Sequence, residues 1–488
     1  MRKRFLALAP LLLAGCAAGP DYQVPDVQAP EQFTESDTTV AFSAADEARF
    51  WGGFDDPMLA ALIQDVLSDN QNLQAALARY QRANALVRGS KAEQLPEVGA
   101  SASASSQHLS VAERAGSQDA NIDLYEVNAN ARWELDLFGQ LRRASEADIA
   151  RLQAAGSDVN ALKVSLAGDV AASYFELRGL QQQLAVARGN VTIQRDSLDI
   201  VRSRLDAGRS TRFDIRRAEA QLERTRAVLP QLDADVRVQM HRIAVLTGRA
   251  PGELIPQLSS PQPLPTELPV ISPGTPGDIL RRRPDIRAAE RQLAAATADI
   301  GVVTADLYPH FSLNALIGSV ALDGGDLFTG SAESRSIGLG IDWSFLNFGR
   351  VRSRIDAADA DAQAALANYR QVILDALEET ENRLVRYARA QQRTERLTAS
   401  AAAARDAADL ARTRYEQGYI GYFEVLDAER EQLNSENALE QGRTASVLAM
   451  VNLYRALAGA PQATSTGNYA VAAEPTAQGK PADNPERL

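Results

Sequence analysis

The sequence predicts a mixed α and β fold that is internally duplicated. Its strands belong to a membrane β-barrel that is completed by oligomerisation and continues into a long α-helical barrel. The segment Trp133-Glu-Leu-Asp-Leu-Phe-Gly139 recurs as Trp343-Ser-Phe-Leu-Asn-Phe-Gly349, at an offset of 210 residues. Strict alternation of apolar and polar residues precedes each copy. A helical pattern of 68 residues follows each copy, over 140–207 and 350–417.

A period of two predicts the strands. Between Tyr125 and Leu137 the odd positions are apolar or aromatic and the even positions polar or charged, so one face of the strand is apolar. The run is as long as the about 9–11 residues that a tilted strand needs to cross a bilayer. Similar alternation predicts strands at 311–317 and 337–345, and a weaker pattern predicts one at 98–106.

Apolar spacing at helical intervals predicts the helices. Shorter helices are expected at 58–94 and 285–306, each leading into a strand pair. Each 68-residue helix is roughly 100 Å long at the usual rise per residue, so it requires a partner along its length. Helices that return alongside the long helices are expected at 211–247 and 422–458.

The N-terminus has the pattern of an exported lipoprotein. A basic Arg2-Lys-Arg4 precedes a short apolar stretch, which predicts a signal peptide over 1–15. Leu13-Ala-Gly-Cys16 resembles the bacterial lipobox, which implies that Cys16 is the lipidated first residue of the mature protein. Cys16 is the only cysteine, so no internal disulfide can form.

These patterns divide the chain into six segments. A signal peptide (1–15), a lipidated tether with an equatorial segment (16–57), a first repeat (58–252), a linker (253–276), a second repeat (277–461) and a polar C-terminal tail (462–488) are expected. Each repeat contains a helix, two strands and a long helical hairpin.

Composition and motifs exclude several functions. The net charge of −12 disfavours a nucleic-acid partner, because phosphate binding needs a basic face. No apolar run reaches the 18 or so residues of a spanning helix. The three histidines are far apart in sequence, and neither a zinc-protease motif, a phosphate loop nor a nucleophile elbow occurs. We therefore expect neither an enzyme nor a metal or cofactor site.

Four strands cannot close a barrel by themselves, because about eight is the smallest known number. An open sheet in lipid leaves backbone groups unpaired at its edges. If these strands enter a membrane, several chains must therefore close the sheet together. The pattern alone leaves the number of chains open.

Two further stretches carry a family resemblance: Arg281-Arg-Arg-Pro-Asp-Ile-Arg-Ala-Ala-Glu290 and Leu307-Tyr-Pro-His-Phe311. With them, essentially the whole mature chain resembles the TolC/OprM outer-membrane efflux proteins, and within these the NodT-type lipoprotein branch. The resemblance implies a homotrimer, lipid-anchored in the outer membrane and extending into the periplasm as an α-barrel. It further implies an exit duct for small molecules that works with a periplasmic adaptor (membrane fusion protein) and an inner-membrane pump of the resistance-nodulation-division (RND) class.

The first stretch also has a purely structural explanation, which we favour. Pro284 suits the first turn of a helix and Asp285 complements its dipole, while the arginines can pair with nearby acids.

The resemblance also assigns roles at the two hairpin ends. Glu424 and Asp427 match a pore constriction, and Tyr415 with Asp214 matches a gate latch, although a further latch arginine is replaced by Ile420. Arginines of the first end are expected to pair with Glu416 or Glu424 or to meet an acidic adaptor surface. The residues expected at the adaptor-facing ends are Arg204, Gly208, Arg209, Arg212, Arg414 and Gly418.

Three alternatives remain open at this point. A type I secretion duct would pass whole proteins, a periplasmic coiled-coil lipoprotein would have no pore, and a metal-ion duct would export cations. The lipobox argues against the first, the strand alternation against the second, and the scarcity of Met and His against the third.

Overall fold

A computed structural model describes residues 17–27, 30–34, 50–112, 120–269 and 274–457. The predicted signal peptide, Cys16 and the predicted tail (462–488) lie outside these residues. No helix among the described residues is both long and apolar enough to cross a bilayer. The elements, in chain order, are η2 (Trp51–Phe54), α2 (Pro57–Asp69), α3 (Gln71–Ala92), β1 (Glu97–His108), β2 (Asn121–Leu135), α4 (Gln140–Asp206), α5 (Arg212–Leu246), α6 (Ile255–Leu258), α7 (Pro276–Arg282), α8 (Pro284–Ala305), β3 (His310–Ala321), η3 (Gly324–Asp326), β4 (Glu333–Asp342), α9 (Phe348–Gln417) and α10 (Tyr422–Leu457).

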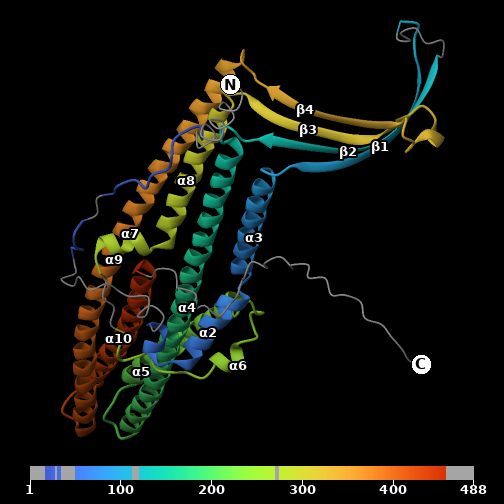
Figure 1. Cartoon of the computed structure of the whole chain (residues 1–488). Coiled ribbons are helices and arrows are strands. Elements are labelled where there is room, and N and C mark those ends of the chain that lie inside the picture. Colours follow the sequence, from blue (N-terminus) through green and yellow to red (C-terminus); the bar gives the residue numbers. More distant parts are fainter. Residues whose placement is uncertain (1–16, 28–29, 35–49, 113–119, 270–273, 458–488) are drawn as a thin grey trace, which may run out of the picture.

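The helices form an elongated body with the sheet at one end and the two hairpin ends at the other (Figure 1). Helix α4 packs against α3, α5, α8 and α10, and α9 packs against α8 and α10. Four helices therefore lie in a row at each level: α3, α4, α8 and α9 near the sheet, and α5, α4, α10 and α9 toward the hairpin ends. The two long helices, α4 and α9, span both levels.

The long helices and their returning partners match the predicted ranges to within two residues. Two glycines of α4 explain how it approaches α10 closely. A Cβ on Gly179 would lie 2.1 Å from Thr444 Oγ1, and one on Gly168 would lie 2.3 Å from Arg455 Cδ. These close contacts supply the tertiary packing that offsets the poor helix propensity of glycine.

The helix predicted over 58–94 is wrong as a single element. Asn70 interrupts it with extended backbone (ψ 124°), and its side chain accepts hydrogen bonds from the backbone of Asn72 and Leu73. The Asn70 amide also donates to the Leu246 carbonyl, over 2.8 Å. The apolar period continues through the break, so it concealed an internal cap.

The sheet is antiparallel in the order β1-β2-β3-β4, which leaves one edge of β1 and one edge of β4 unpaired within the chain. Directly paired residues share a face: Val127 lies opposite Ser319, and Ala129 opposite Ile317. The odd positions of β2, β3 and β4 thus form one apolar face with an even-numbered series from β1. The fourth strand ends at Asp342, three residues before the predicted end at Phe345, which lies in the turn into α9.

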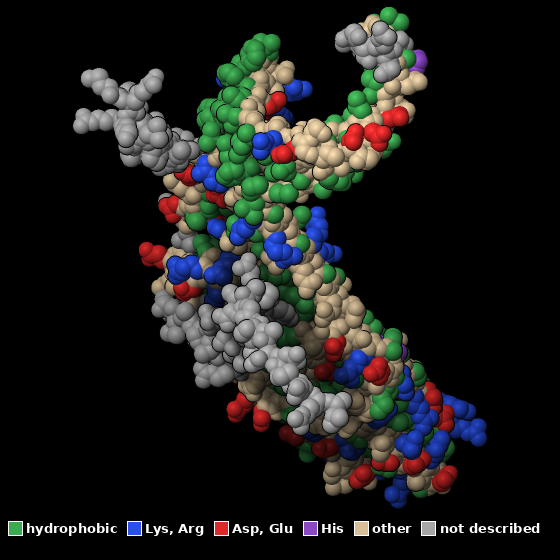
Figure 2. Space-filling view, turned by 45° about the vertical axis from the view of Figure 1, so that its right-hand side comes forward, with side chains coloured by type: hydrophobic (Ala, Val, Ile, Leu, Met, Phe, Trp, Pro, Cys, Tyr) green, Lys and Arg blue, Asp and Glu red, His purple; other side chains and the backbone are tan. Residues whose placement is uncertain are grey.

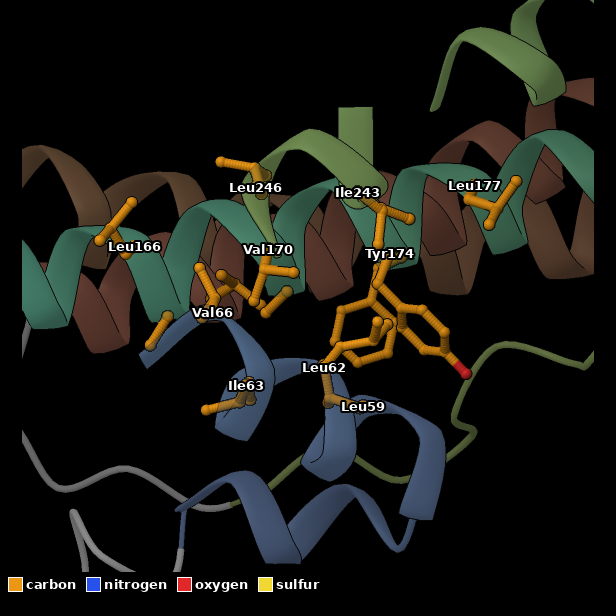
Figure 3. Close-up of a cluster of buried hydrophobic side chains, with 14 of the residues drawn as sticks. Leu59, Leu62, Ile63, Val66, Leu166, Val170, Tyr174, Leu177, Ile243 and Leu246 are labelled. Carbon is orange, nitrogen blue, oxygen red and sulfur yellow. The ribbon is translucent and has the colours of Figure 1, made fainter. Parts of the chain in front are cut away.

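The largest apolar core lies around α2, in the middle part of the helical body (Figure 1), and Figure 3 shows its side chains from close by. Helix α2 packs crosswise on α4 and on the end of α5, and Tyr174 Oη donates to Asp56 Oδ2 at the start of α2 (2.6 Å). The core therefore holds the hairpins together well away from their ends. Its most buried members include Leu59, Leu62, Val66, Val170, Tyr174, Leu177 and Ile243.

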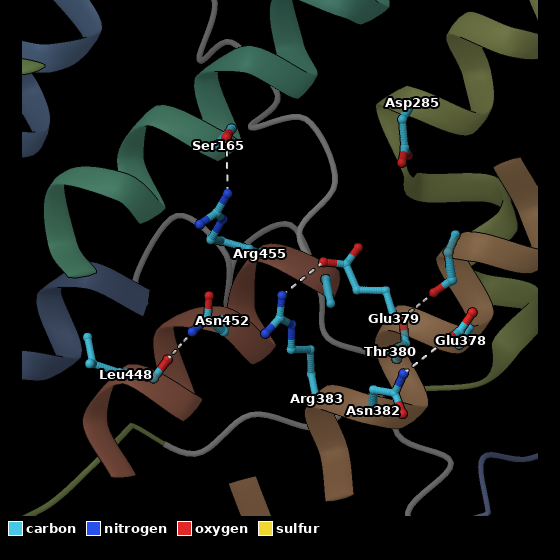
Figure 4. A network of polar contacts seen from close by, with 12 residues as sticks. Ser165, Asp285, Glu378, Glu379, Thr380, Asn382, Arg383, Leu448, Asn452 and Arg455 are labelled. Atoms are coloured by element: carbon cyan, nitrogen blue, oxygen red, sulfur yellow. Dashed lines mark hydrogen bonds and ion pairs between the residues drawn. The ribbon is translucent and has the colours of Figure 1, made fainter. Parts of the chain in front are cut away.

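Polar contacts join the start of α8 to α9 and to the end of α10. Figure 4 shows the neighbouring contact of Arg455 on α10 with Ser165 on α4. The Arg283 side chain is buried and donates to Asp285 (2.7 Å), Glu379 (3.0 Å) and the Ala456 carbonyl (3.1 Å). Pro284 occupies the first turn of α8. The arginine-rich stretch thus has a structural role, as the sequence predicted: it joins the start of α8 to α9 and α10.

Candidate functional site

The two hairpin ends have the same backbone geometry. Gly208 (φ 71°) and Gly418 (φ 84°) are left-handed, as predicted. The N–H of Arg209 donates to the Arg204 carbonyl (2.7 Å), and the N–H of Tyr419 donates to the Arg414 carbonyl (2.9 Å). This six-residue closure is the usual end of a helix at glycine, so both hairpins reverse at equivalent positions.

Tyr415 and Asp214, the two residues of the expected gate latch, are not hydrogen-bonded to each other in the structure. Asp214 accepts instead from Thr211 N (3.0 Å), Thr211 Oγ1 (2.7 Å) and Ser210 Oγ (3.1 Å), in the cap of its own helix. Burial opposes ionisation of Asp214, but these hydrogen bonds outweigh it and lower the pKa of the carboxyl. The carboxylate is therefore engaged within its own hairpin.

Tyr415 is buried (5% exposed), and its hydroxyl has no hydrogen-bond partner. The guanidinium of Arg204 lies over its ring at 4.3 Å, and Arg204 Nη2 donates to the Glu416 carbonyl (3.2 Å). The expected pairing of Arg204 with a carboxylate is thus replaced by a ring contact and a carbonyl. This cation–π contact joins the first hairpin end to the second.

A second cation–π contact between the hairpin ends was not predicted from the sequence. The guanidinium of Arg217 lies 4.7 Å from the ring of Phe423 and 5.3 Å from that of Phe213. Phe213 and Phe423 are 210 residues apart, the same offset as the repeated Trp-to-Gly segment, and this spacing was the available signal. The remaining predicted tip arginines, Arg209, Arg212 and Arg414, are exposed, and basic side chains gather at the hairpin ends (Figure 2).

Glu424 and Asp427 lie in the first two turns of α10, and both are exposed. Neither joins an ion pair in the part of the chain that the structure describes, where no cluster of His, Cys, Asp and Glu is suited to a metal ion either. Between them Val425 and Leu426 are buried against the neighbouring helices. Both carboxylates are therefore exposed and have no ion-pair partner among the described residues.

A largely buried polar layer, which the sequence did not predict, joins the hairpins above their ends, and Arg405 is its exposed member. Glu429, Gln432 and Glu436 share one face of α10 and are at most 8% exposed. Glu429 accepts from Ser197 on α4 (2.5 Å), and Glu436 accepts from Arg405 on α9 (2.8 Å). We call this layer the polar seam; its members are Asn190, Gln194, Ser197, Arg405, Arg412, Glu429, Gln432 and Glu436.

The polar seam is incompletely satisfied. Both amide atoms of Gln194, Glu429 Oε2 and Arg412 Nε are buried without a hydrogen-bond partner. Burial raises the pKa of Glu429 despite its bond to Ser197. Burial acts in the same direction on Glu436, but hydrogen bonds from Gln432, Arg405 and Asn190 lower its pKa overall. Each buried unpaired group costs about 1–3 kcal/mol. The polar seam therefore stabilises the contact between the hairpins less than the apolar core does.

The residues that follow Cys16 lie at the junction of sheet and helices (Figure 1). The N–H of Ala18 donates to the Phe138 carbonyl (2.8 Å), and the Ala18 carbonyl accepts from Arg143 Nε (3.2 Å). A Cβ on Gly19 would lie 2.4 Å from Gly301 Cα, so the segment packs directly on α8. Residue 17 is thus held where β2 leads into α4.

Comparisons with known proteins agree on one family. The model of the outer membrane efflux protein family matches the chain twice, over 62–249 and 275–459. Nodulation protein T of Rhizobium leguminosarum bv. trifolii is 32% identical over 86% of this chain and 89% of its own length. The solvent efflux pump outer membrane protein SrpC of Pseudomonas putida is 29% identical over 92% of this chain and 96% of its own length. The solved structure of the outer-membrane channel OprN is 39% identical, with a TM-score of 0.85, and covers 92% of this chain and 100% of that one.

Proposed function

Because the chain belongs to the outer membrane efflux protein family, whose members are channels and not enzymes, we propose that it is the exit duct of one tripartite efflux system. In that system it receives solutes from an RND-type pump of the inner membrane through a periplasmic adaptor. The observation that carries this proposal is the combination of an open four-stranded sheet with two long hairpins that end in equivalent turns.

Three chains would form the complete duct. The unpaired edge of β4 would join the unpaired edge of β1 in the next chain, which gives twelve strands and removes every edge. The helical rows would continue into one another in the same way, because α9 and α3 or α5 end each row. The duct would then cross the outer membrane and extend into the periplasm.

A lipid anchor on Cys16 fits this arrangement. Ala18 is hydrogen-bonded to Phe138, just after the end of β2. Cys16, two residues before Ala18, would therefore lie at the periplasmic surface of the membrane. An acyl chain attached there could enter the inner leaflet without crossing the sheet. The anchor would supplement the barrel, since lipidation alone gives weaker attachment.

At the hairpin ends, Glu424 and Asp427 would form rings of like charge around the threefold axis. Such rings attract cations and select among solutes. Tyr415 and Asp214 would act at the gate through separate contacts, Tyr415 with Arg204 and Asp214 with its own cap. The exposed Arg209, Arg212 and Arg414 would meet acidic residues of the adaptor.

Small organic molecules, including drugs, are the proposed cargo. The relative SrpC is described as part of a solvent efflux pump, which supports this class over folded proteins. A periplasmic lipoprotein without a pore is disfavoured because its sheet edges would remain open. The scarcity of Met and His argues against a cation duct.

The test combines cells with purified protein. Deleting the gene should increase accumulation of exported compounds, and the wild-type chain should restore efflux. In planar bilayers, purified trimers of the Glu424→Gln, Asp427→Asn double variant should conduct more and lose cation preference, relative to wild type. Glu416→Gln, an exposed change at the same end, is the matched control. Unchanged accumulation on deletion would contradict the efflux role, and unchanged conductance would contradict the constriction.

A further inference from the structure

The apolar face of the sheet contains a groove beneath the loop between β3 and β4. Its floor includes Ala100, Val127, Ala129 and Ile317, and its volume is about 480 Å³. The strand register puts all four of these residues on the apolar face, because Ala129 lies opposite both Ala100 and Ile317, while Val127 pairs with the neighbouring residues of that face. The groove therefore opens away from the polar face of the sheet.

The loop that covers the groove is held in place by specific bonds. The backbone N–H of Phe328 donates to Ser319 Oγ (3.0 Å), and Ser319 is only 4% exposed on the apolar face. Thr329 Oγ1 donates to the Asp326 carbonyl (2.7 Å), which closes the loop on itself. The loop thus folds back over the apolar face instead of extending the hairpin.

Phe328 is in an unfavourable state for a chain in water. Its φ of 67° is left-handed, which is rare for a bulky residue, and its side chain is 76% exposed. Ile317 on the floor is also 60% exposed. An apolar partner that covers both residues would offset this cost.

The position of the groove indicates which lipid is near. Val127 is six residues from Trp133 along β2, or about 20 Å at the usual strand rise, in the direction away from the helices. If Trp133 marks the periplasmic surface, the groove lies in the outer half of the membrane. The outer leaflet of this membrane consists of lipopolysaccharide, whose lipid A carries acyl chains and phosphates.

A charge on the same face supports this choice. Arg335 lies opposite Ile317, and its side chain is 81% exposed. Its ion-pair contact in the described chain is Glu333, at 3.6 Å. Because an arginine on the lipid face is destabilising, most of all near the midplane, it gains by extending to an anionic headgroup.

We propose that the groove binds one acyl chain of lipid A from the outer leaflet, and that Arg335 contacts a phosphate of the same molecule. The site rests on the proposed function, since it requires the sheet to lie in the outer membrane. It would attach one lipid molecule to each chain of the trimer, three per duct.

The test uses full-length trimers extracted from outer membranes in a mild detergent. Native mass spectrometry should detect lipid A on wild-type trimers. Ala129→Trp fills the groove and should reduce retained lipid A by at least about tenfold, because losing two buried CH₂ contacts already corresponds to that factor. Ala131→Trp, on the same face but outside the groove, should retain it, and Arg335→Gln should retain less.

The same wild-type trimers are recorded in planar bilayers, which separates the two hypotheses. Conducting trimers that carry no lipid A would overturn the lipid site and leave the duct intact, whereas an absence of conducting trimers would overturn both. Equal retention by Ala129→Trp and wild type would also refute the site. Retention of phospholipid in place of lipid A would overturn the assignment to the outer leaflet.

Discussion

At the scale of single residues, Glu429 makes the contact between the hairpins depend on pH. Burial raises the pKa of its carboxyl, so the folded chain keeps this proton to a higher pH than the unfolded chain does. The resulting stabilisation is complete below the unfolded pKa and is lost as the pH rises through the folded pKa. The groups that face Glu429 are Ser197, Arg412 and Tyr422.

We therefore expect Glu429→Gln to raise the thermal midpoint at neutral pH and to flatten its dependence on pH. Removing the charge leaves the bond to Ser197 possible, and the effect should be of the order of 1–3 kcal/mol. Thermal unfolding of wild type and variant from pH 4.5 to 8 measures it, with Glu416→Gln as the exposed control. A variant that is less stable than wild type at neutral pH would contradict this account.

Single residues were also where the sequence was least informative about the site. Gly208 and Gly418 were predictable because the left-handed end of a helix selects glycine. The partner of Tyr415 was not, because a ring contact with Arg204 leaves no pattern in sequence. The polar seam was hidden for a related reason: Glu429 and Glu436 have the spacing of ordinary solvated carboxylates until α4 covers them.

At the scale of elements, the glycines of α4 differ in how closely a neighbouring helix packs on them. A Cβ on Gly179 would lie 2.1 Å from Thr444 Oγ1, whereas one on Gly189 would meet nothing within 4 Å. Gly179→Ala should therefore destabilise the protein by about 1–3 kcal/mol through overpacking against α10. Gly189→Ala should stabilise it by up to about 1 kcal/mol, since alanine favours the helix.

Denaturant unfolding of the two variants beside wild type measures both effects, and each serves as the control for the other. Equal shifts of the same sign would show that helix propensity alone decides and that close packing on Thr444 does not matter.

Element ranges were predictable wherever one period continued without interruption. The spans of α4 and α9 followed from helical spacing and from the equal offset between the repeats. Asn70 shows the limit, because its cap leaves the apolar spacing of α2 and α3 in phase. The short helix α7 was also missed, since its seven residues are too few to establish a period.

At the scale of the whole molecule, the row of helices is incomplete at both ends. Leu410 on α9 is 64% exposed, and Val238 on α5, at the opposite end of the row, is 60% exposed. The number of strands was enough to predict that the chain needs partners, since four strands cannot close a barrel alone. Which side chains meet across the interface between chains was not predictable, because the contacts within one chain do not involve that surface.

If α9 of one chain packs on the next chain, Leu410 is buried only in the trimer. Burying a leucine contributes about 1.5–3 kcal/mol, and the threefold assembly multiplies this at three interfaces. Leu410→Glu should therefore reduce heat-modifiable trimers on electrophoresis of outer-membrane fractions, while Leu410→Met, with similar volume, should preserve them. Far-UV circular dichroism of the purified chains separates loss of assembly from loss of folding. Normal trimers of a folded Leu410→Glu chain would place this residue outside the interface, and the face of α9 that carries it would then line the duct or the periplasm.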